Sequence, residues 1–131
     1  HMRTADGRVR HIILSEEGFT SDSPTRGKVY DIQAAAYAYA YYLVDANPYI
    51  DAFILNRQVD SVVEVNTSCA FGIWTVDMER NDKVAAVMPK NIYNVFKYID
   101  TKQSLKYTEF AKEIIGISSW SEVIPGFKLE E

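Results

Sequence analysis

Two short, strongly apolar segments stand out in the first half of the chain, at residues 9–15 and 50–55. Both are rich in isoleucine and too short for ordinary helices. Apolar runs that do not alternate with polar positions are typical of strands buried on both faces, as in a parallel sheet. The pattern therefore predicts two strands of that kind.

The segment between these strands, residues 28–45, is apolar almost throughout. Its tyrosines alternate as in a strand, but its length and its many alanines favour a helix, because alanine is the best helix former. Strand, helix and strand then form a βαβ unit with two parallel strands. The residues expected on one helical face are Ile32, Ala35, Ala36, Tyr39, Tyr42 and Leu43.

The second half of the chain predicts two more helices. The first begins at Pro89 and covers residues 90–99, since proline suits the first helical position. The second covers residues 106–115 and should end at Gly116. A tail at residues 120–127 is expected to fold back on the body. The expected buried stripe of the first of these helices is Ile92, Tyr93, Val95, Phe96 and Ile99.

Composition narrows the classes of function. With 131 residues, of which 47% are hydrophobic, the chain can build one core. Fourteen basic residues against 18 acidic ones give a formal charge of 14 − 18 = −4. We therefore expect neither nucleic acid nor an anionic membrane as the main partner. The longest apolar run, residues 34–44, is well short of the ~20 residues that cross a bilayer.

The cysteine content and the first two residues bear on disulfides, metal sites and the limits of the domain. Cys69 is the single cysteine, so an intrachain disulfide is impossible and no thiolate metal cluster can form. No residue spacing indicates a metal site, and we expect no cofactor. Residues 1–2, His-Met, look like a remnant of cloning. We therefore take residues 3–131 as a single domain.

Candidate chemistry follows the two predicted strands. Glu16 and Glu17 come directly after the first strand, and Arg57 and Asp60 follow the second. In parallel α/β proteins, functional residues gather at the carboxyl ends of the strands. Because successive strand residues point to opposite faces, only one of the two glutamates can face a given site.

At this point the sequence resembles a known group of enzymes. Leu-Ser-Glu-Glu-Gly at residues 14–18 resembles the end of the seventh strand in clan A glycoside hydrolases, which are (β/α)8 barrels. In that segment of those enzymes the first glutamate is the catalytic nucleophile. Phe-Gly-Ile-Trp at residues 71–74, a charged turn, and residues 89–96 are similar to the passage from the eighth strand to the last helix of such barrels.

Further motifs resemble an uncharacterised bacterial family of glycoside-hydrolase-like barrels. They lie at residues 13–19, 50–53 and 96–101, and the match covers most of residues 10–127. The resemblance implies an α/β fold: strand seven to helix eight of a (β/α)8 barrel with parallel strands, followed by a C-terminal helical extension. It also implies a secreted, periplasmic or cell-surface location.

The resemblance also implies roles for individual residues. Glu16 matches the nucleophile of a retaining glycosidase. Such an enzyme needs a second carboxylic acid about 5–5.5 Å away, which in this clan comes from strand four, outside this segment. We therefore expect a parent enzyme that hydrolyses glycosidic bonds, and no turnover by the isolated chain. The residues expected around the sugar are Glu17, Arg57, Asp60 and Trp74.

Two other hypotheses stay open. The chain could be a non-catalytic carbohydrate-binding module that uses Trp74 and the tyrosines, or a structural module for assembly. Two parallel strands alone have exposed edges, which predicts self-association or pairing with the rest of a barrel. A structural role also stays open for each candidate residue: Glu16 caps a loop or pairs with an arginine, Arg57 and Asp60 form a structural ion pair, and the tryptophans serve packing.

Overall fold

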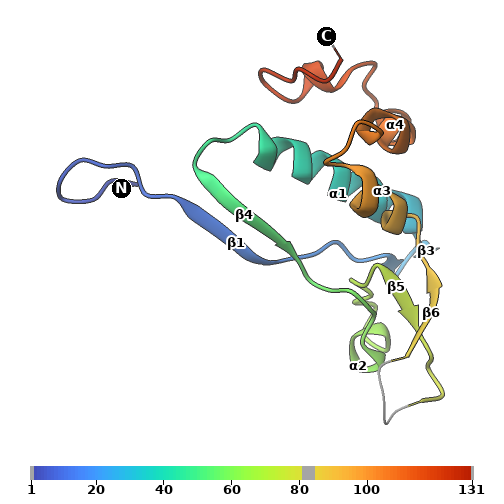
Figure 1. Cartoon of the computed structure of the whole chain (residues 1–131). Helices are drawn as coiled ribbons and strands as arrows, with labels where there is room; N and C mark the ends of the chain where they lie inside the picture. Colours follow the sequence, from blue (N-terminus) through green and yellow to red (C-terminus); the bar gives the residue numbers. More distant parts are fainter. Residues whose placement is uncertain (1, 81–84, 131) are drawn as a thin grey trace.

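A computed structural model describes residues 2–80 and 85–130, so His1 of the expected cloning remnant lies outside the described residues. Strands β1 (Ile12–Glu17) and β4 (Ile50–Leu55) cross the molecule beneath helix α1 (Tyr30–Asp45), as Figure 1 shows. Helices α3 (Ile92–Tyr98) and α4 (Ser104–Ile115) pack against α1. No helix of the described part is long and apolar enough to span a membrane.

The predicted pair of parallel strands is confirmed. β1 pairs only with β4 in the described structure, and Leu14 lies beside Phe53. At the carboxyl end, the backbone N–H of Asn56 donates to the carbonyl of Glu17 at 2.6 Å. A Cβ atom at Gly18 would collide with the carbonyl oxygen of Asn56, so the two strand ends can approach this closely only with glycine there.

Helix α1 is confirmed, but the predicted buried face is only partly right. Ala35 and Tyr42 are buried as predicted, whereas Ile32 and Leu43 are 38% and 40% exposed and Tyr37, outside the predicted face, is only 4% exposed. Because the helix is apolar on all sides, periodicity alone does not select the face that neighbours cover. The residues of α1 that are buried are Gln33, Ala34, Ala35, Tyr37, Ala38 and Tyr42.

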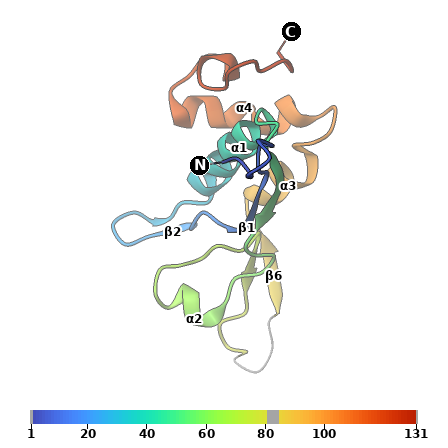
Figure 2. The same cartoon turned by 90° about the vertical axis from the view of Figure 1, so that its left-hand side faces the viewer.

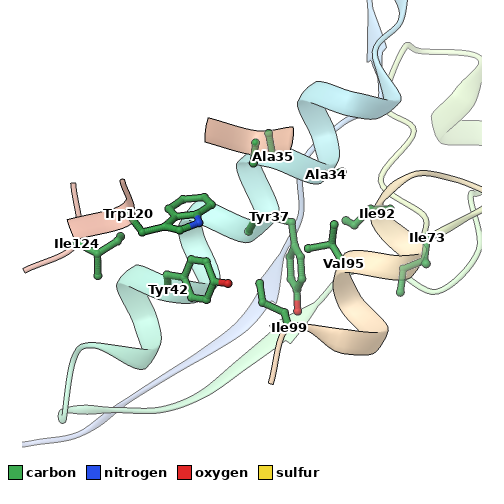
Figure 3. Close-up of a cluster of buried hydrophobic side chains, with 12 residues drawn as sticks. Ala34, Ala35, Tyr37, Tyr42, Ile73, Ile92, Val95, Ile99, Trp120 and Ile124 are labelled. Carbon is green, nitrogen blue, oxygen red and sulfur yellow. The ribbon is translucent and has the colours of Figure 1, made fainter. Parts of the chain in front are cut away.

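The core fills the space between α1, α3, α4 and the tail, and Figure 3 shows its side chains. The Trp120 ring meets the Tyr42 ring edge to face at 4.8 Å between centroids. The Tyr42 hydroxyl bonds Ser104 Oγ at 2.6 Å. Trp120 begins the short 3-10 helix η1 (Trp120–Glu122) and is fully buried, so the tail does fold back on the body.

The structure contains several short elements that the sequence pattern did not predict. Helix α2 (Val62–Val65) follows β4. Strands β5 (Trp74–Val76) and β6 (Ala86–Pro89) pair antiparallel, and β2 (Asp22–Ser23) pairs with β3 (Gly27–Lys28). Pro89 therefore ends a strand instead of beginning a helix. Figure 2 shows α2 and β6 at the opposite end of the molecule from α4.

The predicted barrel segment is wrong. In the described residues the chain forms a small mixed α/β domain with one parallel pair and two short antiparallel pairs. An α-helix and an antiparallel hairpin intervene between β4 and α3, where the barrel pattern requires a direct passage. Ile13 and Ile54 are 61% and 51% exposed, whereas barrel strands are covered on both faces.

Candidate functional site

The predicted nucleophile lies at the carboxyl end of β1. Glu16 is exposed and Glu17 is half-buried. The cross-strand neighbour of Glu17 is Leu55, the last residue of β4. The two glutamates thus end beside the second strand, as the parallel pairing predicts, but neither lines the pocket described below.

Asp60 is a buried anchor. Its Oδ1 atom accepts hydrogen bonds from Lys90 Nζ and from the Gly72 backbone N–H, both at 2.7 Å. Lys90 Nζ also donates to Ser21 Oγ at 2.8 Å. Burial lowers the pKa of Lys90, and its hydrogen bond to Asp60 opposes that shift. This network joins the segments around residues 21, 60, 72 and 90 in the interior.

Arg57 and Asp60 do not pair with each other. Arg57 Nη1 lies 3.2 Å from Glu64 Oε2 in a half-exposed ion pair, while Asp60 pairs with Lys90 inside the molecule. The expected structural ion pair is therefore replaced by two separate pairs. The partner of Asp60 is 30 residues away along the chain, a separation that local sequence spacing does not reveal.

Gln33 completes the buried network from helix α1. Its Nε2 atom lies within hydrogen-bond distance of the carbonyls of Phe19 and Gly72, at 2.9 and 3.2 Å. Gln33 is the single amide side chain of a mostly apolar helix, and this was the one sequence signal for its role. The amide thereby helps to hold the segment that leads into β5.

An open pocket of about 460 Å³ lies between β4, β5 and α3. Trp74 and Tyr93 form one corner of it, with ring centroids 5.3 Å apart and planes at 72°. The volume is in the ~300–1,000 Å³ range of small-molecule sites. The lining residues are Phe53, Ile54, Leu55, Gln58, Ile73, Trp74, Tyr93 and Phe96.

Backbone hydrogen bonds fix the position of Trp74. Its N–H donates to the Gln58 carbonyl, and its own carbonyl accepts from the Asp60 N–H, both at 3.0 Å. The Lys90 N–H donates to the carbonyl of Ile73 at 2.9 Å. The buried Asp60–Lys90 pair thus holds both segments that frame the indole.

Of the predicted site residues, only Trp74 lines this pocket. Tyr93 and Phe96, which sequence reasoning placed in the buried stripe of a helix, are the lining residues that α3 contributes. Phe96 is in fact 46% exposed. Their i, i+3 spacing marks a shared helical face, but the pattern gives no means to tell a pocket wall from a core contact.

The pocket offers stacking surfaces and few polar groups. The Gln58 amide, the Tyr93 hydroxyl and the Trp74 indole N–H are the polar side-chain groups of its lining. Among the described residues no carboxylate lines it, and nowhere in that part of the chain do three or more His, Cys, Asp or Glu side chains form a group that could hold a metal ion. The arrangement is suited to binding a ligand that has apolar faces.

Comparison with curated proteins finds no match, and comparison with solved structures finds none either. The resemblance to glycoside hydrolases therefore stays a prediction from sequence motifs. A family model covers residues 1–123, nearly the whole chain. It is described as a family of unknown function, and the protein belongs to that family, DUF5722.

Proposed function

We propose that the protein binds carbohydrate, without turning it over, in the pocket between β4, β5 and α3. The observation that carries this proposal is the corner formed by Trp74 and Tyr93, whose ring planes meet at 72°. A sugar ring has apolar C–H faces that pack on aromatic rings. Its hydroxyls need hydrogen-bond partners, which amide and phenol groups supply.

The other lining residues support the same ligand class. Phe53 and Phe96 add aromatic surface, and the half-exposed setting of Trp74 leaves part of the indole open to a ligand. The Gln58 amide can donate and accept at the same time, as a sugar hydroxyl does. A mostly apolar wall with a few polar groups is the usual composition of a small-molecule site.

The distribution of carboxylates favours binding over hydrolysis. A retaining glycosidase places two carboxyl groups about 5–5.5 Å apart around the scissile bond. The described lining holds none, and Glu16 and Glu17 lie at the end of the neighbouring strand. We therefore expect no release of the leaving group from aryl glycosides by this chain.

Calorimetric titration with a panel of oligosaccharides tests the proposal. We expect saturable binding that Trp74→Ala weakens by tenfold or more, because loss of a stacked aromatic ring costs on the order of 1.4 kcal/mol. Tyr49→Ala is the matched control, since Tyr49 is 45% exposed and lies outside the pocket. Tryptophan fluorescence provides a second readout, because Trp120 is fully buried elsewhere.

Two results would overturn the proposal. One is equal affinity of the wild type and Trp74→Ala for every glycan that binds, or no binding to any glycan, in proteins whose circular dichroism is native. The other is hydrolysis of an aryl glycoside that Glu16→Gln abolishes, which would make the site catalytic and place it at the end of β1.

A further inference from the structure

Strand β1 has one open edge. In the described part of the chain it pairs only with β4. The N–H groups of Arg10 and Ile12 donate to the carbonyls of Met2 and Tyr49, at 2.7 and 2.9 Å. Amides two residues apart in an extended strand point to the same side. The N-terminal hairpin therefore continues the β4 side and leaves the other edge of β1 uncovered.

The residues along β1 carry a charge pattern that reverses from one end to the other. Arg8, which forms an ion pair with Asp6 at 2.7 Å, and Arg10 precede the strand, and Glu16 and Glu17 end it. Between them lie Ile12, Ile13 and Leu14, of which Ile12 and Ile13 are 37% and 61% exposed. Two copies of this segment placed antiparallel set basic ends against acidic ends, with isoleucines in the middle. A parallel arrangement sets like charges side by side.

We propose that the open edge of β1 pairs antiparallel with β1 of a second copy of this chain. The product is a two-fold symmetric dimer with a four-stranded sheet in the order β4–β1–β1–β4. A strand paired with itself around Ile13 makes the same contact from both sides, which closes the assembly at two copies. Charge complementarity within the strand selects this occupant, since pairing centred on Ile13 places Arg10 of each copy opposite Glu16 of the other.

Charge-reversal variants distinguish attraction between the paired strand ends from the overall electrostatic repulsion between two negatively charged copies. Glu16→Lys with Glu17→Lys, the acid-end variant, changes the formal charge from −4 to −4 + 4 = 0. Reduced overall repulsion alone would strengthen the dimer. Local pairing instead places four basic side chains at each end of the interface, and we expect the dimer dissociation constant to rise by roughly tenfold or more.

Sedimentation velocity over a range of concentrations, at low salt, measures the dimer. Arg8→Glu with Arg10→Glu, the basic-end variant, should also dimerise roughly tenfold or more weakly than the wild type. An equimolar mixture of the two variants should form a heterodimer, and the variant carrying all four substitutions should dimerise again. Restoration by the fourfold variant shows that loss in the single-end variants is not a failure to fold.

Three results would overturn the proposal: a wild type that stays monomeric at all concentrations, an acid-end variant that dimerises as well as or better than the wild type, or a mixture without heterodimer. Glycan binding at the Trp74 pocket is measured separately on the same variants. Failure of the dimer therefore leaves the carbohydrate proposal standing, and the reverse holds as well.

Discussion

The burial of Tyr37 makes the stability of the protein depend on pH in the alkaline range. Its ring stacks on Phe53 at 5.7 Å between centroids and its side chain is nearly inaccessible. Burial raises the pKa of Tyr37, and the nearby Tyr41 and Asp100 raise it further. An unfolded chain ionises tyrosine near pH 10, so this tyrosine contributes full stability below that pH and loses it as the pH rises further.

Tyr37→Phe should therefore flatten the alkaline fall in the free energy of unfolding. The slope above about pH 10 should decrease by at most ~1.4 kcal/mol per pH unit, the contribution of one group. Urea unfolding at several pH values between about 8 and 11 measures it. Tyr41 and Tyr42 also have raised pKa values because of burial, so part of the fall remains. Identical slopes in the variant and the wild type would contradict this expectation.

At the scale of elements, the Asp60–Lys90 pair ties the loop after β4 to the strand before α3. Both side chains are almost completely buried, at 4% and 0% exposed. Removing one partner of a buried pair leaves the other charge without compensation, which typically costs about 3–5 kcal/mol. Asp60→Ala should reach that range in urea unfolding. It should also weaken glycan binding, because the pair holds both segments around Trp74.

Glu64→Ala is the matched control for Asp60→Ala. Its ion pair with Arg57 is half-exposed, and pairs of that kind contribute about 1 kcal/mol or less. Similar losses in both variants would contradict the assignment of Asp60 as an internal anchor.

Elements specified by local signals were predictable from the sequence. The helix at residues 104–115 ends at Gly116 because that residue adopts a left-handed conformation, with φ of 82°. Elements that depend on distant partners were not predictable. The β5–β6 pair joins Trp74 to Pro89 across a charged segment, and nothing in either short stretch marks the other as its partner.

The candidate site was likewise hard to predict, because it also depends on residues that are distant in the sequence. Trp74 could be singled out from the sequence, but its pocket requires α3, whose aromatic residues fit a core stripe equally well. The role of Asp60 could not be predicted either, since it depends on a lysine whose ammonium group is brought inside by the fold. Charged residues in a loop are normally solvated, so the sequence favoured a surface role.

At the scale of the whole molecule, the C-terminal tail closes the helical layer. Trp120 is fully buried, and Phe127 adds a second ring 4.8 Å from Tyr42. Trp120→Ala should destabilise the whole domain by about 3–5 kcal/mol, the usual cost of a large core truncation. Trp120→Phe should cost less, because the indole N–H has no hydrogen-bond partner in the described structure.

Thermal and urea unfolding measure these two variants. Leu129→Ala, in the same tail, is the control, since Leu129 is 52% exposed and should shift stability by about 0.5 kcal/mol or less. A Trp120→Ala variant as stable as that control would show that the tail is an accessory to the domain and not part of its core.

The barrel interpretation failed at this same scale. Isoleucine-rich runs indicate strands, but they do not show how many further strands exist or whether both faces are covered. The structure covers one face of the parallel pair with α1 and leaves Ile13 and Ile54 largely exposed. Short motifs at strand ends can therefore resemble a barrel while the chain that carries them folds into a smaller layered domain.

The way in which β4 borders the pocket limits the shape of any ligand. Phe53, Ile54 and Leu55 are consecutive, and successive strand residues point to opposite faces of a sheet. Since all three line the pocket, it follows the margin of β4 that has no strand partner in the described structure. A ligand in this pocket therefore lies along an edge of the sheet and not on one of its faces.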